Sequence, residues 1–310
     1  MNEDVMLRAD EKKINWYPGH MVRAKRALAD QLSRVDVVVE LCDARIPRAS
    51  RNPDLADMIK NKRHLLVLGK ADLADERETR AWLGYFRAQG IDCMSFDSIR
   101  GKAKDIIARI EKASADAVAK MAAKGVKKTV RVMIVGVPNV GKSTFTNRIN
   151  GASIARTGDR PGVTRSNQWV RITPYLELLD TPGLLWPNLS DQQDARALAF
   201  VGTINDNIMD QQMLAIRLME RLMEDHADAL TTRFKLKNNA LRGVPLLEEA
   251  CRCRGWLLPG GVCDTDRGAA VILDEFRAGK LGRITLQKAP AKPPKETTPV
   301  REAKKEEQSS

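Results

Sequence analysis

The chain has 310 residues, of which 43% are hydrophobic and 30% charged, with a formal net charge of +12. This length and apolar content predict a substantial core divided between two domains, and no run of about 18 apolar residues marks a membrane span. The excess of positive charge favours a polyanionic partner such as nucleic acid, or an acidic membrane surface.

The N-terminal stretch MNEDVMLRADEKK carries acidic residues and no apolar run, so we expect neither a secretory signal nor an ordinary transit peptide. Residues 1–185 then alternate strand and helix patterns. Short strands are predicted at 35–45, 64–72, 91–97, 130–136, 167–173 and 175–183. Several are nearly continuous apolar runs, which is typical of strands buried on both faces of a mostly parallel sheet. Helical patterns lie between them, for example Thr79 to Gln89 before Gly90, so an α/β domain with helices on both faces is predicted.

Beyond Pro187 the strand signals stop and helical periodicity takes over, with Leu214, Leu218 and Leu222 on one apolar stripe. We therefore predict an α/β domain at 12–187, a smaller all-α domain at 188–287 and a disordered charged tail at 288–310. The cysteines lack a paired framework, and the spacing in Cys251-Arg-Cys253 differs from that of a usual zinc knuckle. This usage predicts a reducing, cytoplasmic environment.

The segment GVPNVGKS (136–143) fits the phosphate-loop pattern GxxxxGK[ST] between a predicted strand and a predicted helix. An ordinary turn would not need that strand–loop–helix setting, so we predict a nucleotide site. Lys142 is expected to reach the β- and γ-phosphates, and Ser143 to ligate Mg²⁺. The predicted nucleotide contacts from this loop are Pro138, Asn139, Val140, Gly141, Lys142, Ser143 and Thr144.

Two further stretches predict the metal and switch functions. In LLDTPG (178–183), Asp180 is expected on the metal side, and the amide of Gly183 is expected to sense the γ-phosphate. In TGDRPGVTR (157–165), the hydroxyl of Thr164 is expected to close over Mg²⁺ when the third phosphate is present, with Thr157 as the competing candidate.

The base-reading element lies ahead of the phosphate loop. In LLVLGKADL (65–73), Lys70 and Asp72 match an Asn-Lys-x-Asp guanine element, with Gly69 in the place of the asparagine. The next strand ends in SFDSIRGK (95–102), where Asp97 and Ser98 suit a second base-contacting loop. This order predicts that the base-reading half of one continuous sheet precedes the phosphate loop by circular permutation.

The order of these motifs resembles that of circularly permuted GTPases. The stretches WYPGHM (16–21) and DEFRAGKLGRI (274–284) resemble the ribosome biogenesis GTPase A family, also called YlqF or RbgA, over roughly residues 12–287. The resemblance implies a cytoplasmic, Mg²⁺-dependent GTPase that acts late in assembly of the bacterial large ribosomal subunit. It also implies that the helical domain contacts ribosomal RNA, which agrees with the basic charge.

Two departures from the usual Ras-like pattern carry predictions. Gly69 lacks a carboxamide, but Asp72 can still accept hydrogen bonds from guanine, so we expect guanine preference with weaker affinity. Leu184 follows DTPG, where many GTPases carry a Gln that orients water. The resemblance assigns water positioning to His20, whose imidazole suits proton chemistry near neutral pH.

Similar GTPases with Asn at the position of Asn139 bind K⁺, which predicts a K⁺ site here.

The short link from Leu184 to Ser190 joins DTPG to the helical domain, so we hypothesise that GTP selects a domain arrangement that fits the maturing subunit. Two alternatives stay open: a GTPase that acts on another RNA, such as tRNA or the small subunit, and a nucleotide-gated RNA-binding scaffold with negligible hydrolysis. Nothing in the sequence indicates an obligate dimer, so a monomer is expected.

Overall fold

In the computed structural model the chain is described over residues 18–157, 168–180, 191–204 and 210–291. Its centre is a six-stranded sheet in the order β3-β2-β1-β4-β6-β5. The strands are β1 (Val37–Asp43), β2 (Arg63–Gly69), β3 (Cys93–Ser95), β4 (Val130–Val135), β5 (Gln168–Thr173) and β6 (Leu176–Asp180). All pair in parallel except β5, which is antiparallel to β6. Each strand lies within a segment where the apolar pattern predicts one, except that β2 begins one residue earlier, at Arg63.

Strand β1 joins the two halves of the sheet. Val38 is in register with His64 of β2 on one side and with Met133 of β4 on the other. The strand of the base element and the strand of the phosphate loop therefore belong to one sheet, as the circular permutation predicts. The strands that precede β4 in sequence lie on one side of it in the sheet, and the strands that follow it lie on the other side.

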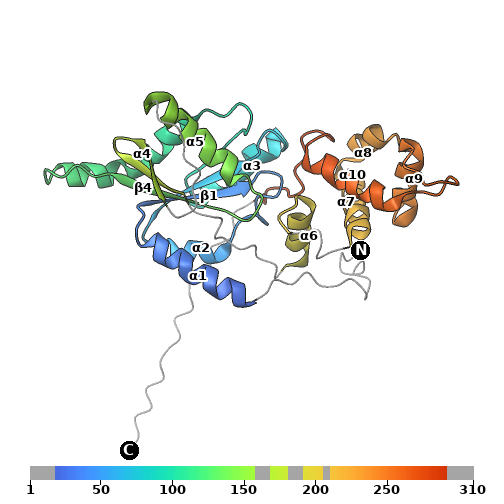
Figure 1. The fold of residues 1–310 in the computed structure, drawn as a ribbon, viewed down its shortest axis with the longest axis horizontal. Helices are drawn as coiled ribbons and strands as arrows, with labels where there is room; N and C mark the ends of the chain where they lie inside the picture. The colour runs from blue at the N-terminus through green and yellow to red at the C-terminus, as the bar shows by residue number, and fades with distance from the viewer. Residues whose placement is uncertain (1–17, 158–167, 181–190, 205–209, 292–310) are drawn as a thin grey trace, which may run out of the picture.

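Helices cover both faces of the sheet, and the period of two along β1 assigns each face. Leu41 and its alternate neighbours pack with Ile106 of α4 (Ala103–Ala122) and Phe145 of α5 (Lys142–Thr157). The opposite face packs against α1 (Pro18–Leu32) and α2 (Pro53–Met58), and against α3 (Glu76–Ala88) through Trp82. Because both faces are covered, every residue of β1 is buried, which explains its nearly continuous apolar run. Figure 1 shows α4 and α5 on one side of the sheet and α1 and α2 on the other.

The second part of the chain is helical. It comprises α6 (Gln192–Phe200), α7 (Gln211–Asp225), α8 (Ala227–Phe234), α9 (Val244–Arg254) and α10 (Thr265–Arg277). The predicted stripe of Leu214, Leu218 and Leu222 lies buried on α7, at the centre of this part. Aspartates begin the two longest of these helices, since Asp210 caps α7 and Asp264 caps α10. Within the described ranges no helix combines the length and apolarity that a membrane crossing requires.

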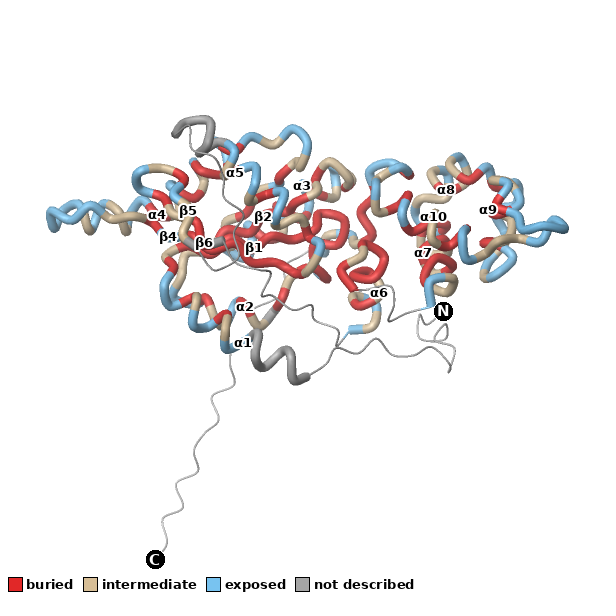
Figure 2. Tube along the Cα trace, viewed as in Figure 1, coloured by how far each residue is buried: buried red, intermediate tan, exposed pale blue. Residues whose placement is uncertain are grey.

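The chain returns from α10 to the sheet domain in an extended segment. The amide of Ile284 donates to the carbonyl of Leu73 at 3.0 Å, and the indole of Trp82 donates to the carbonyl of Gln287 at 2.7 Å. Lys288 and Ala289, at the start of the predicted tail, still contact Asp225 and Glu78, so the ordered chain extends past 287. The buried core in Figure 2 runs through the sheet and α6 into the helical part. The exact domain boundaries stay a prediction.

Candidate functional site

The phosphate loop connects the end of β4 to Lys142 at the start of α5, and its two glycines meet different needs. A Cβ on Gly136 would lie 2.5 Å from the carbonyl oxygen of Leu41 in β1, so the neighbouring backbone allows no side chain there. Gly141 has φ of +101°, a conformation that L-residues rarely adopt. The first glycine thus permits close approach to the sheet, and the second permits the turn into α5.

Lys142 lies over this loop. Its Nζ donates to the carbonyls of Gly136 and Val137, each at 2.7 Å. Burial lowers the pKa of Lys142 to about 8, because removal from water disfavours the ammonium form. A phosphate bound at the N-terminus of α5 would restore a favourable field for that charge. Ser143 and Thr144 are exposed in the first turn of the helix, where their groups are accessible to a nucleotide.

The base element meets the phosphate loop through Lys70, which follows β2 in a left-handed conformation with φ of 53°. Its Nζ donates to the carbonyl oxygen of Asn139 at 2.6 Å. The same ammonium group lies 3.2 Å from a carboxylate oxygen of Asp43. Two motifs that are far apart in sequence are therefore in direct contact at one edge of the sheet.

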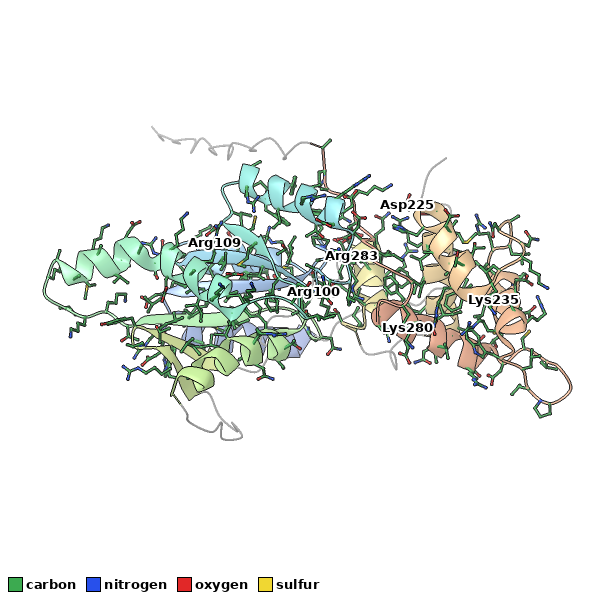
Figure 3. The ribbon with its side chains drawn as sticks, turned by 90° about the horizontal axis from the view of Figure 1, so that it is seen from above. Arg100, Arg109, Asp225, Lys235, Lys280 and Arg283 are labelled. Atoms are coloured by element: carbon green, nitrogen blue, oxygen red, sulfur yellow. The ribbon has the colours of Figure 1, made fainter. Side chains whose placement is uncertain are left out.

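The second base loop closes the other side of the base element. The carboxylate of Asp72 accepts from the amide of Ser98 at 2.7 Å. Asp97 folds back on its own loop, accepting from the amide of Arg100 at 2.6 Å (Arg100 is labelled in Figure 3). Arg148 of α5 donates to the carbonyl of Ser98 at 2.9 Å, which ties this loop to the phosphate-loop helix. The structure therefore brings Asp72, Asp97 and Ser98 together, while their contacts to the base stay predictions.

The remaining predicted loop contacts differ in exposure. Val140 is buried in the core, so it would offer a nucleotide its backbone amide rather than its side chain. Pro138 is half-buried and has no amide hydrogen to donate. Asn139 is exposed, and its carboxamide nitrogen donates to the carbonyl of Gly202 at 2.6 Å.

A buried ion pair at the end of β1 was missed by the sequence reasoning. The guanidinium of Arg45 donates to both carboxylate oxygens of Asp43, at 3.0 and 2.8 Å, and both side chains are 2% exposed. Burial alone would raise the pKa of Asp43, but Arg45 and Lys70 outweigh it and lower that pKa to about 2. An acid followed by an Arg at the end of an apolar strand, in VDVVVELCDAR, was the available signal.

Several predicted residues fall outside what the structure describes. Thr164, Gly183 and Leu184 lie outside the described residues, as do the side chains of His20, Thr157 and Asp180. The backbone places His20 in the first turn of α1 and Asp180 at the end of β6. Because β6 is parallel to β4, Asp180 shares the sheet edge of the phosphate loop.

The donor set at this edge fits Mg²⁺, the metal that GTPases generally use. The exposed hydroxyl of Ser143 and the carboxyl position at the end of β6 supply oxygen donors from two neighbouring elements. Bound there, Mg²⁺ would neutralise charge on the β- and γ-phosphates.

These features define a class of protein. A phosphate loop follows one strand, an acid ends the next parallel strand, and a Lys-x-Asp element ahead of the loop in sequence contacts it within the same sheet. That arrangement is a circularly permuted P-loop GTPase domain, here followed by a helical part.

Comparison with known proteins gives the family. A family model described as "50S ribosome-binding GTPase" matches residues 131–236. Ribosome biogenesis GTPase A of Priestia megaterium is 42% identical over 276 residues, covering 88% of this chain and 96% of that protein. The protein of that name from Thermotoga maritima is 32% identical, with 93% and 98% covered. The chain belongs to the ribosome biogenesis GTPase A family.

Solved structures agree with this assignment. The GDP-bound structure of TM YlqF superimposes with a TM-score of 0.65 at 27% identity, covering 85% of this chain and 99% of that one. GNP-bound YlqF from T. maritima gives a TM-score of 0.62 at the same identity, with 86% and 98% covered. The fold and the permuted motif order are therefore shared with a nucleotide-binding relative.

Proposed function

We propose that this GTPase binds the precursor of the large ribosomal subunit in the cytoplasm, as a monomer, and gates a late step of its maturation. The observation that carries the nucleotide part is the contact of Lys70 with Asn139, which joins the guanine element to the phosphate loop at 2.6 Å. The ribosomal part is supported by relatives named ribosome biogenesis GTPase A and by the net charge of +12, which suits ribosomal RNA.

In the proposed reaction the loop amides and Lys142 hold the phosphates, while Ser143, Thr164 and Asp180 hold Mg²⁺. The amide of Gly183 senses the γ-phosphate. Leu184 has no polar atom to orient the attacking water, so we assign that positioning to His20, in the first turn of α1.

A K⁺ ion beside the β- and γ-phosphates is a second part of the proposal. The nitrogen of the Asn139 carboxamide is engaged with Gly202, and its oxygen is the atom with the chemistry to ligate a cation. Faster turnover in K⁺ than in Na⁺ buffer would support the ion, and equal rates would remove it.

We further propose that the helical part contacts ribosomal RNA and that GTP sets its orientation through the 184–190 link. Among its basic residues, Arg283 donates to the carbonyls of Ala71 and Ala74 at 2.9 and 2.8 Å. Figure 3 shows Arg283 where the two parts meet, so its guanidinium serves that junction. We assign RNA contact to the other basic residues of this part that the sequence favours: Lys280, Arg252 and Arg254. Linkage requires that subunit binding and nucleotide state affect each other.

The decisive experiment measures GTP turnover with and without purified large subunits, for the wild type, His20→Ala and His226→Ala. We expect subunits to stimulate the wild type and His226→Ala alike, and to stimulate His20→Ala far less. Full stimulation of His20→Ala would refute the role of His20. Absence of stimulated turnover in every protein would favour the RNA-binding scaffold, and co-sedimentation with small subunits or tRNA instead would favour the other RNA target.

A further inference from the structure

Asn139 is held from two directions. Its carbonyl oxygen accepts a hydrogen bond from Lys70 of the base element, and its carboxamide donates to Gly202, just beyond α6, each at 2.6 Å. Its backbone is in the left-handed region with φ of 57°, so both contacts act on a residue in a rarely adopted conformation. The phosphate loop therefore depends on where the Gly202 carbonyl is placed.

The placement of Gly202 depends in turn on Arg277, in the last turn of α10. The guanidinium of Arg277 donates to the carbonyls of Phe200 at 3.1 Å and Ala199 at 2.9 Å, at the end of α6. A Cβ on Gly202 would lie 3.2 Å from Nε of Arg277, so the guanidinium packs directly on this glycine. A cation that binds the last carbonyls of a helix also stabilises the negative end of its dipole.

The same turn of α10 reaches Asn139 by a second route. Arg45 donates to the backbone carbonyl of Arg277 at 3.2 Å, and its guanidinium carbon lies 5.6 Å from the centroid of the Phe276 ring. Arg45 is paired with Asp43, and Asp43 lies against Lys70. The contacts thus form a closed ring through Asn139, Gly202, Arg277, Arg45, Asp43 and Lys70, in which Gly202 and Arg277 are joined by packing and the other neighbours by hydrogen bonds or ion pairs.

We propose that Arg277 is a positioning residue for the phosphate loop, which it controls by placing Gly202 against Asn139. Movement of α10 changes the grip of the loop on a nucleotide without passing through the 184–190 link. By thermodynamic linkage, a bound nucleotide also biases the position of α10. This inference requires nucleotide binding alone and is independent of the ribosomal partner.

The test is the dissociation rate of a fluorescent GDP analogue from the full chain, measured by stopped flow. We expect Arg277→Ala to accelerate dissociation about tenfold, since two charge-assisted hydrogen bonds behind the loop are lost. Arg277→Lys keeps the charge but not the fork geometry, so we expect an intermediate acceleration. Unchanged dissociation from folded Arg277→Ala would overturn the proposal.

Two matched variants separate positioning from general loosening. Arg233→Ala removes the ion pair, at 2.6 Å, between Arg233 of α8 and Glu275 of α10, the helix that also carries Arg277. This pair lies away from the phosphate loop. Arg48→Ala removes the pair of Arg48 with Asp194 of α6, at 2.8 Å, at the junction of the two parts. Both should keep wild-type dissociation, and an equal acceleration in either would contradict a specific role of Arg277.

A double-mutant cycle then tests the route. If Arg277 acts through Asn139, adding Arg277→Ala to Asn139→Ala should change dissociation little beyond the single Asn139→Ala variant. A structural defect elsewhere would give additive effects in the double variant, and additivity would overturn the route. Circular dichroism melts of all variants identify any protein that fails to fold, in which case the cycle is run with Arg277→Lys.

Discussion

At the scale of single residues, the charge of Lys142 is sensitive to its surroundings. Burial lowers its pKa to about 8, while its task at the phosphates requires the ammonium form. Before a nucleotide binds, the proton is therefore lost as pH rises through about 8.

We predict that GDP affinity is nearly constant below that pH and falls up to about tenfold per unit above it, because binding must then restore the proton. Isothermal titrations between about pH 7 and pH 9 measure this. In Lys142→Arg the guanidinium stays charged, so any remaining pH dependence of GDP affinity comes from titration of the guanine base. An affinity that does not change over this range would refute the prediction.

Gly69 gives a second residue-scale prediction. A Cβ there would lie 3.0 Å from Cδ1 of Leu41, a side-chain atom that can shift, so an asparagine can be accommodated. We expect Gly69→Asn to tighten GTP binding by about tenfold, the contribution of a purine-contacting carboxamide. Gly69→Ala adds the Cβ alone and should not tighten binding.

ATP titrations of the wild type check the predicted guanine preference; ATP binding as tight as GTP would count against Asp72.

The Asp43 carboxylate predicts an acid-sensitive contribution to stability. Its pKa is about 2 in the folded protein against 3.8 as the reference value, so the folded state favours the ionised form. The resulting stabilisation, about 2 kcal/mol, is present above pH 4 and is lost as pH falls through about 2. Urea denaturation of the wild type and Asp43→Asn across this window measures it. Equal pH slopes for the two proteins would contradict the prediction.

The sequence predicted residues whose roles follow from spacing, such as Lys70, Asp72 and Lys142. It did not indicate Asp43 and Arg45 as a pair, because the sequence pattern of an acid at the end of a strand is the same whether that acid is exposed or buried. The contact of Asn139 with Gly202 was also beyond prediction, since its acceptor is a backbone carbonyl with no sequence signature.

At the scale of elements, the phosphate loop is built against the backbone of β1. We predict that Gly136→Ala costs about 2–3 kcal/mol and impairs nucleotide binding, because its Cβ would meet a rigid strand carbonyl rather than a flexible side chain. Gly151→Ala on α5 is the matched control, since a Cβ there has open space. It should stabilise by about 0.5–1 kcal/mol. Denaturation in urea compares the free energies of unfolding of the two variants. If Gly136→Ala left this free energy unchanged, β1 would have moved to accommodate the added Cβ, against the prediction.

Apolar runs located the strands because these are buried on both faces, and the Leu stripe located α7 for the corresponding reason in a helix. The returning segment near Ile284 and Leu286 was not predicted. It is held by single backbone hydrogen bonds, from Ile284 to Leu73 and from Leu286 to Arg45. Such bonds need no repeating pattern of side chains.

At the scale of the whole molecule, one hydrophobic cluster extends from β1 through Leu198 and Phe200 to α7 and α10. The side chain of Gln287 adds polar contacts across the same junction, accepting from the amides of Arg48 and Ala49 and donating to Asp194. The sheet domain and the helical part therefore share a core.

We predict that heating unfolds both parts in a single transition, with equal calorimetric and van't Hoff enthalpies. Scanning calorimetry without nucleotide measures this, and Gln287→Ala should lower the midpoint while keeping one transition. Two resolved transitions in the wild type would show that the shared core does not couple the parts.

The strand order also has a consequence for biosynthesis. Because β2 pairs with both β1 and β3, and all three strands precede β4 in the chain, a nascent chain can assemble this parallel trio, with its helices, before β4 has been translated. The unpaired edge of β1 would then be available when β4 leaves the ribosome, and β4 would add to the sheet by pairing with it. The predicted guanine element at the end of β2 would thus be folded before the phosphate loop has been synthesised.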